Sequence, residues 1–371
     1  MAFPGISGLD VPPSFCSRTF RSLLPAPTAL RLVGCWLAAA VSLEVAPAAA
    51  SAESVAEFYA GKQVRIIVGG TAEGGYAPYA RMLQNHMGQY IPGKPQVIVQ
   101  FMPGAGGLVA ANYVYNVAPQ DGTVIGSVQR NVARLALIGD KGAKYDPTKI
   151  NWIGSLHNDV SVCVAWHTSG AKTIQDVMER ELIVGGTGLN DTEQFPALLN
   201  NILGAKFKII SGYNGSAAIS LAMERGEVFG RCGWSWDSLK SQKGEWLADK
   251  KVNILVQLSL KKLPEIGEVP LAIELANTKD KRDVLEFVFG EQTMGKPFMM
   301  AAGVPNDRVK AVQEAFMKTA ADQAAIAEMN KLGFGVSPLS GENMQQLVEK
   351  MYATPQEVID RASEAVAPRS K

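Results

Sequence analysis

The sequence has few of the residues that catalysis and metal binding most often use. Its 371 residues include only three histidines, His86, His157 and His167, and four cysteines. None of the histidines has the spacing of a metal site, and no serine or cysteine lies in a nucleophile-elbow context. The sequence therefore predicts neither a metal centre nor a catalytic triad.

Excess charge is also lacking. The chain has 36 lysines and arginines against 35 aspartates and glutamates. Nucleic acids and anionic membrane surfaces are bound by strongly basic surfaces, so neither is an expected partner. We find no tandem repeat and, after residue 52, no long low-complexity tract. A hydrophobic content of 47% is enough for one or two ordinary cores.

Long hydrophobic runs are absent, and the one notable apolar run lies near the N-terminus. Arg18, Arg21 and Arg31 precede residues 32–41, which are almost entirely apolar, and small residues follow up to Ala52. This order is typical of a secretory signal, and the run is too short for a comfortable membrane span. We predict a signal peptide over residues 1–52, cleavage near Ala52 and a secreted protein.

Two details of this segment remain open to other interpretations. Leu32-Val33-Gly34-Cys35 resembles a lipobox, but Arg31 interrupts the apolar stretch before it, so plain cleavage is favoured over lipidation. The segment before Arg18 is long for a signal, which suggests a start codon downstream of Met1.

Cys163 and Cys232, in apolar strand-like runs, are consistent with a disulfide and equally with buried free thiols.

From residue 58 onward, short strand-like runs alternate with helical patterns. Such alternation predicts an α/β fold with parallel sheets covered by helices. The predicted strands are 64–68, 96–100, 123–128, 161–166, 182–185, 206–210, 228–232, 252–258 and 298–301. The predicted helices include 78–87, 108–116, 192–203 and 216–225, a short helix opened by a capping box at 173–176, and a helical tail from Asn306.

More than three hundred residues after the signal suggest two lobes. The strands fall into one set before Trp152 and another after Val160, and the strand at 298–301 comes later. We predict that residues 53–157 begin lobe I, that 158–292 form lobe II and that 293–371 complete lobe I.

Two glycine-rich turns, at residues 69–76 and 103–107, each follow a predicted strand and precede a predicted helix. The free backbone N–H groups at a helix start attract anions. These turns therefore predict a site for a carboxylate or a phosphate. Gly104-Ala105-Gly106-Gly107 lacks the spacing of a dinucleotide fingerprint, and no Walker motif is present, so we expect no cofactor.

Several motifs occur in an order that resembles a known family. They are Pro103-Gly104-Ala105-Gly106-Gly107, Ala118-Pro119-Gln120-Asp121-Gly122-Thr123, Gly185-Gly186-Thr187-Gly188, Tyr213-Asn214-Gly215-Ser216-Ala217 and Ala302-Gly303-Val304-Pro305. From Phe58 to the C-terminus, the chain resembles the Bug/TctC-type extracytoplasmic solute receptors of tripartite tricarboxylate transporters. The resemblance implies a two-lobe periplasmic binding protein fold, type II-like, with two crossovers and a small carboxylate in the cleft between the lobes.

The resemblance places the ligand at the two glycine turns and at lobe II loops over residues 186–192 and 213–216. Arginines at strand ends are candidates for binding a carboxylate bidentately. Trp234, also near a strand end, is a candidate for an apolar wall against the ligand. A surface position is an equally good interpretation for Arg130 and for Arg231, and ordinary core or cleft packing is the favoured interpretation for the aromatic residue Trp234 taken alone. The candidate ligand-binding residues are Gly74, Gly75, Tyr76, Gly104, Ala105, Gly106, Gly107, Arg130, Asn131, Thr187, Gly188, Tyr213, Ser216, Arg231 and Trp234.

Two further points qualify the lobe II candidates. Thr192 and Ser216 are also candidate helix N-caps. Asp191 would repel an anion, so it ranks below Thr187 and Ser216.

The favoured hypothesis is a non-enzymatic, monomeric receptor without cofactor or metal. It captures a small organic acid, closes by hinge motion and delivers the acid to membrane permease subunits. The alternatives are a Rossmann-like oxidoreductase or hydrolase, and a sensory protein that presents its ligand to a receptor kinase. The sequence decides neither between transport and sensing nor between an aliphatic and an aromatic acid.

Overall fold

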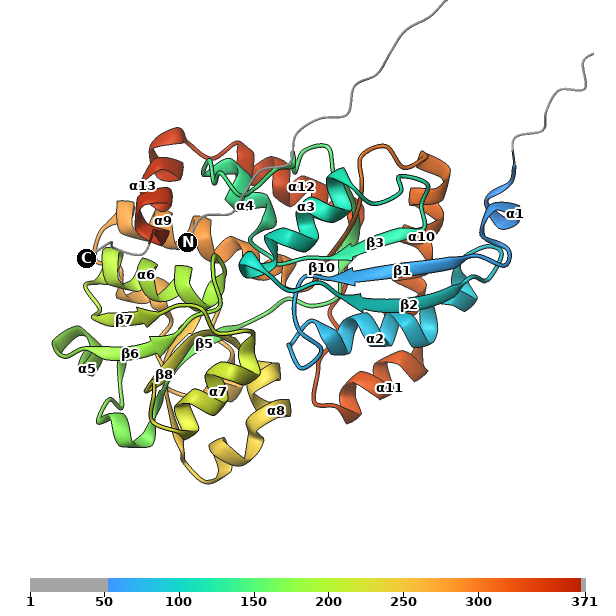
Figure 1. Cartoon of the computed structure of the whole chain (residues 1–371). Coiled ribbons are helices and arrows are strands. Elements are labelled where there is room, and N and C mark those ends of the chain that lie inside the picture. Colours follow the sequence, from blue (N-terminus) through green and yellow to red (C-terminus); the bar gives the residue numbers. More distant parts are fainter. Residues whose placement is uncertain (1–52, 368–371) are drawn as a thin grey trace, which may run out of the picture. The chain divides into compact units, whose positions relative to one another are not determined.

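The computed structural model describes residues 53–367, which form an α/β structure built on two sheets (Figure 1). The predicted signal peptide and its cleavage site lie outside the described residues. The first sheet has the strand order β11-β4-β10-β3-β1-β2. Its strands are β1 (Gln63–Val68), β2 (Gln96–Phe101), β3 (Val124–Ser127), β4 (Asn151–Ser155), β10 (Pro297–Met300) and β11 (Leu339–Ser340).

The second sheet repeats the same plan, with the order β7-β6-β8-β5-β9. Its strands are β5 (Ser161–Trp166), β6 (Leu182–Gly185), β7 (Phe207–Ile210), β8 (Gly230–Ser235) and β9 (Val252–Leu258). In each sheet a central strand, β1 or β6, pairs in parallel with the two strands that follow it in sequence. An antiparallel strand, β10 or β5, then joins the edge of this parallel trio.

The chain passes between the two sheets twice along its strand order. It leaves the first sheet between β4 and β5, and it returns between β9 and β10. The predicted α/β fold with two crossovers is therefore confirmed. The C-terminal helix α13 (Gln356–Val366) packs against α6 (Asp191–Leu203) and α9 (Lys279–Phe289), which belong to the second sheet's part of the chain (Figure 1). The lobe boundaries given above stay a prediction.

The other helices connect the strands and cover the sheets. They are α1 (Val55–Tyr59), α2 (Ala77–His86), α3 (Leu108–Asn116), α4 (Val132–Leu137), α5 (Ile174–Glu179), α7 (Ser216–Glu224), α8 (Trp236–Ala248), α10 (Asn306–Ala320), α11 (Gln323–Lys331) and α12 (Gly341–Tyr352). Short 3-10 turns occur at Met87–Tyr90, Ala105–Gly107, His167–Ser169, Pro264–Ile266, Ala272–Leu275 and Gly290–Met294. No helix among residues 53–367 is long and apolar enough to cross a membrane.

Helix starts follow local chemistry. The predicted capping box is confirmed, because the Thr173 side chain accepts from the Asp176 N–H and Asp176 accepts from the Thr173 N–H. The predicted start of α10 at Asn306, just after a proline, is also confirmed. The N-cap interpretation of Thr192 and Ser216 is wrong, because the N-caps of α6 and α7 are Asn190 and Gly215.

Two strand predictions need correction. The strand expected at 228–232 is β8, which begins at Gly230 and continues to Ser235 with every residue buried. Gly233, with φ of 65°, lies inside the strand, one residue beyond the predicted end. The strands β4 and β11 were not predicted, since β4 is short and β11 has only two residues.

The core of the second sheet contains a disulfide. Cys163 on β5 and Cys232 on β8 are both fully buried and are bonded to each other. The sequence left open whether these two cysteines form a disulfide or stay free thiols, and the structure shows the disulfide. The bond joins the two strands where their register shifts, between Val162 and Val164, so it fixes the part of β8 that carries Arg231.

Candidate ligand-binding site

A cavity of about 420 Å³ lies where the two sheets face each other. The loops after β1, β2 and β3 line one side, and the loops after β6 and β7, together with the end of β8, line the other. In open α/β sheets the crevice at the carboxyl ends of parallel strands is the usual ligand site. The topology of both sheets therefore converges on this one cavity.

The structure brings almost all of the sequence-predicted site residues together. Every candidate except Asn131 lines the cavity. Asn131 lies at the start of α4, fully buried, and its side-chain amide donates to the Leu189 carbonyl and to Gln194 Oε1 at 2.9 and 3.0 Å. It therefore contributes to packing between the two sheets' loops instead of to the cavity wall.

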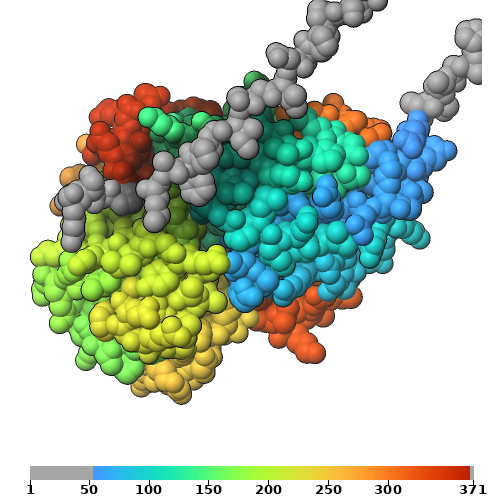
Figure 2. Space-filling model, viewed as in Figure 1, coloured from blue at the N-terminus to red at the C-terminus, as the bar shows by residue number. Residues whose placement is uncertain are grey.

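Loops from opposite sides of the cavity are in close contact with each other. A Cβ on Gly106 would lie 2.8 Å from the Leu189 nitrogen, and a Cβ on Gly75 would lie 2.3 Å from Ser238 Oγ. Gln242 on α8 donates to the Glu73 carbonyl at 2.9 Å. Figure 2 shows the blue segment that follows β1 against the yellow-green and yellow segments that carry α7 and α8. Bare glycine surfaces permit this approach.

The turn before α3 offers backbone donors to the cavity. Gly104, Ala105, Gly106 and Gly107 all have positive φ, from 45° to 137°. Within residues 53–367 the N–H groups of Ala105 and Gly106 donate to no acceptor, whereas those of Gly107 and Leu108 bond back to Gly104 and Ala105. Two free N–H groups at a helix start are suited to a ligand oxygen.

Arg130, at the end of β3, is engaged by the protein's own carboxylates. Its guanidinium lies 2.9 Å from Asp159 Oδ2 and 3.0 Å from Asp191 Oδ2, and it also donates to Gln292. Lys296 pairs with the same Asp159 oxygen. These residues are all at least 94% buried, so a ligand carboxylate would have to displace an internal partner to reach Arg130.

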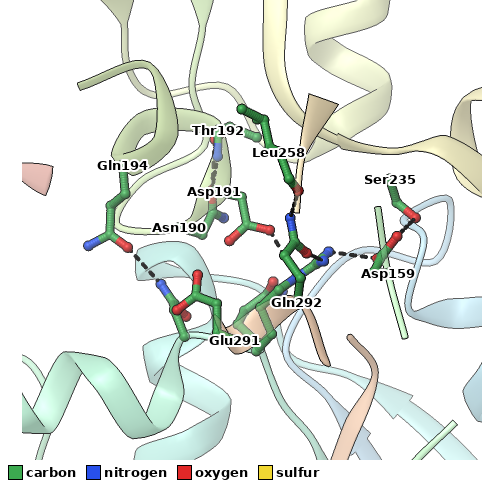
Figure 3. Close-up of polar contacts among 12 residues, drawn as sticks. Asp159, Asn190, Asp191, Thr192, Gln194, Ser235, Leu258, Glu291 and Gln292 are labelled. Atoms are coloured by element: carbon green, nitrogen blue, oxygen red, sulfur yellow. Dashed lines mark hydrogen bonds and ion pairs between the residues drawn. The ribbon is translucent and has the colours of Figure 1, made fainter. Parts of the chain in front are cut away.

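Burial alone would raise the pKa of Asp159, but Lys296 and Arg130 outweigh it and hold that pKa well below its usual range. Figure 3 shows this polar region, with Asp159 accepting from Ser235 Oγ at 2.6 Å and Gln292 donating to the Leu258 carbonyl at 2.7 Å. Beside it, Arg134 pairs with Glu291 at 2.7 Å, and both side chains are fully buried. The network joins α4, α6 and both crossover segments.

Arg231 is different, because no carboxylate within residues 53–367 forms an ion pair with it. Its side chain donates to Ser216 Oγ at 2.8 Å and stacks on the Trp234 ring, with its guanidinium carbon 4.2 Å from the ring centroid. Only 4% of the residue is exposed, and Nε and Nη1 have no hydrogen-bond partner. Burial lowers the pKa of Arg231 to about 9, only partly offset by Asp191. An anion in the cavity would satisfy these orphaned donors.

Sequence reasoning missed part of the cavity wall. Lys296, Gln129, Thr71 and Gln242 line it without having been candidates. Lys296 carried one available signal, because it lies two residues before the apolar strand predicted at 298–301 and a charged residue is rarely buried without a partner. Asp191 was ranked low as a ligand contact, and the structure gives it an internal role as a partner of Arg130.

The hydroxyl groups near the lobe II helix starts are also engaged internally. Thr187 Oγ1 lies within hydrogen-bond distance of both Asn190 and Thr192.

The part of the chain that the structure describes contains no group of three or more histidine, cysteine or acidic side chains able to hold a metal ion.

No protein-family model matches the sequence, and no curated protein matches it. Solved structures do match. The fold is that of a periplasmic binding protein: BugD, a periplasmic binding protein, superposes with a TM-score of 0.64 at 18% identity, covering 80% of this chain and 97% of BugD. MatC from Rhodopseudomonas palustris with bound malate gives 0.63 at 18% identity, covering 80% and 99%.

A third similar structure, an R. palustris protein with adipate, gives a TM-score of 0.62 at 17% identity and covers 81% of this chain and 97% of that one. At such identities the likeness establishes the fold. The chain therefore has the fold of the Bug/TctC periplasmic binding proteins, and the resemblance stated from its motifs is confirmed at that level.

Proposed function

We propose that the protein is a periplasmic receptor that captures a small organic acid in the cavity between its two sheets. The observation that carries this proposal is Arg231, a buried guanidinium in the cavity wall with two donors unpartnered and no carboxylate within ion-pair distance among residues 53–367. A buried, uncompensated charge is costly unless an anion joins it. The free N–H groups of Ala105 and Gly106 supply further donors to ligand oxygens.

The similar structures support an acid as the ligand. One is described with malate and another with adipate. We further propose that residues 1–52 are removed as a signal peptide and that the monomeric receptor delivers its acid to the permease subunits of a tripartite tricarboxylate-type transporter. In this scheme the segments 53–157 and 293–371 form lobe I, residues 158–292 form lobe II, and the protein catalyses no reaction.

A ligand screen by thermal shift tests the function directly. The panel contains short- and medium-chain dicarboxylates, their monoacids, citrate, aromatic acids, amino acids and nicotinamide cofactors. A ligand that binds only the native state raises the melting temperature. At a ligand concentration one hundred times Kd, the free energy of unfolding rises by about 2.7 kcal/mol. We expect shifts with one class of organic acid and none with the cofactors.

Recovery of the bound acid completes the test. The acid that gives the largest shift is incubated with the protein and analysed by mass spectrometry. We expect it to be recovered unchanged. A shift with a nicotinamide cofactor, no shift with any acid, or chemical conversion of the acid would contradict the receptor function.

A further inference from the structure

The charged groups around the cavity are unevenly matched. Three cationic side chains line it: Arg130, Lys296 and Arg231. Asp159 pairs with both Arg130 and Lys296, and Asp191 pairs with Arg130. Two cations and two carboxylates thus form one ion-paired cluster with no net charge.

Arg231 is the remaining cation, and its geometry is fixed before any ligand arrives. The Trp234 ring supports one face of the guanidinium, and Ser216 accepts one of its N–H groups. Trp234 is 1% exposed and its Nε1 also lacks a partner, so the same wall holds another orphaned donor. A carboxylate in the cavity would supply Arg231 with the anionic partner that it lacks within residues 53–367.

Beyond Arg231, the charged side chains of residues 53–367 around the cavity offer no unpaired positive charge to a second anion. Asp191 itself lines the cavity. Glu193, 5% exposed, accepts from the Gly188 N–H at 2.6 Å, behind the loop that forms this wall. Within the described residues no lysine, arginine or histidine pairs with Glu193. Within residues 53–367, a second carboxylate on the ligand would therefore meet Asp191 in the cavity wall and no cationic side chain that lacks an ion-pair partner.

We propose that the cavity selects organic acids that carry a single negative charge, with the carboxylate on Arg231 and an uncharged remainder. This rests on the proposed function as an organic-acid receptor. The N–H groups of Ala105 and Gly106 then donate hydrogen bonds to an uncharged oxygen, such as a hydroxyl, carbonyl or ester oxygen. The apolar part of the ligand packs on the aromatic side chains of Tyr76 and Tyr213, which line the same cavity.

Matched pairs of acids test the charge selection. Terephthalate and adipate carry two carboxylates, and their monomethyl esters have the same skeletons with one charge. Isothermal titration at neutral pH, where every free carboxyl is ionised, gives the four affinities. We expect the monoester of at least one pair to bind about tenfold or more tighter than its diacid.

Substitutions at Arg231 assign the effect to this residue. Arg231→Met keeps an apolar side chain of similar length, and we expect it to weaken binding of the preferred monoester about a hundredfold. The melting temperature of the ligand-free variant should be unchanged or higher, because a buried uncompensated charge is removed. Arg231→Lys should keep the preference for one charge. Arg225→Met, at an arginine with 62% of its side chain exposed, should change neither affinity nor preference.

The possible failures are distinct. If an acid of the four binds but neither monoester binds more tightly than its own diacid, the charge selection is wrong while the receptor function stands. Equal loss of affinity for diacid and monoester in both Arg231 variants would also overturn it. If none of the four acids and no other acid of the thermal-shift panel binds, the proposed function and the charge selection fail together.

Discussion

Gly106 and Leu189 come from loops of different sheets, and their backbones touch across the mouth of the cavity. A Cβ on Gly106 would lie 2.8 Å from the Leu189 nitrogen and 2.9 Å from its carbonyl carbon. Backbone atoms cannot rotate away as the end of a side chain can. Approach of the two loops therefore depends on the absence of a side chain at residue 106.

We expect Gly106→Val to abolish ligand binding while the protein remains folded, because the valine side chain holds the two loops apart. Gly106 also has φ of 65°, so the substitution should reduce the free energy of unfolding by about 1–2 kcal/mol. Titration with the acid from the thermal-shift screen, together with urea unfolding, measures both effects.

Gly139→Val is the matched control, since Gly139 has φ of 75° and nothing within 4 Å of its ideal Cβ. It should show a similar loss of stability and full affinity. Wild-type affinity in Gly106→Val would show that the contact between these loops is not needed for binding.

Asp159 is the common partner of Arg130 and Lys296, and all three are nearly fully buried. Asp159→Asn leaves Lys296 without its carboxylate partner and leaves Arg130 with Asp191 alone, so two like charges face each other with one carboxylate between them instead of two. We expect a loss of about 3–5 kcal/mol in the free energy of unfolding, measured by urea denaturation at neutral pH.

Lys296 and Arg130 hold the pKa of Asp159 below its usual value against the effect of burial. Its stabilisation is therefore present above the unfolded pKa and disappears only as the pH falls through the lower folded pKa. The exposed pair of Glu314 and Lys318, 3.8 Å apart, supplies the control. Glu314→Gln should change stability by less than about 0.5 kcal/mol, and an equally small effect of Asp159→Asn would contradict the assigned role.

The disulfide between Cys163 and Cys232 closes a loop with a sequence separation of 69. We expect the double variant Cys163→Ala/Cys232→Ala to lose about 4 kcal/mol of unfolding free energy in the oxidised protein, from the loop entropy of the unfolded chain. Reductant should lower the melting temperature of the wild type and leave the double variant unchanged. Identical stabilities of the two oxidised proteins would show that the bond contributes nothing.

His157 lies in the segment between β4 and β5, 3.3 Å from Asp237 and 3.4 Å from Ser337 Oγ. Burial lowers the pKa of His157; Asp159 and Asp237 oppose this, and Lys296 and Arg130 reinforce it. The imidazole of His157 therefore takes up a proton more readily in the unfolded chain than in the folded one. Stability should therefore fall as the pH drops below the ordinary histidine value of 6.5.

We expect His157→Gln to flatten the decline of melting temperature between neutral and mildly acidic pH. His167→Gln, at an exposed histidine, should follow the wild-type profile. A wild-type slope in the His157 variant would assign the pH dependence to other groups.

Much of the fold follows from local patterns in the chain. The strands at 161–166, 182–185 and 252–258 and the helix at 108–116 were predicted with the bounds that the structure has. Turns, caps and hydrophobic periodicity involve residues a few positions apart, so they are visible in the sequence. The glycine turns were placed correctly at the cavity for the same reason, since each lies between a strand and a helix.

The role of Arg130 shows what such patterns do not reveal. A strand-end arginine was a reasonable candidate for the ligand's carboxylate, but the structure pairs it with Asp159 and Asp191. Only the tertiary structure could show that pairing, or that Lys296 lies against Asp159, 137 positions earlier.

The sequence by itself determined the alternation of strands and helices, the two glycine turns and the likeness to a family of solute receptors, because these depend on neighbouring residues. The tertiary structure decided which charges are matched. It neutralised Arg130 and Lys296, turned Asn131 away from the cavity, joined Cys163 to Cys232 and left Arg231 unpaired. Charge pairing depends on distances between residues far apart in the chain, and only the folded arrangement of both sheets sets those distances.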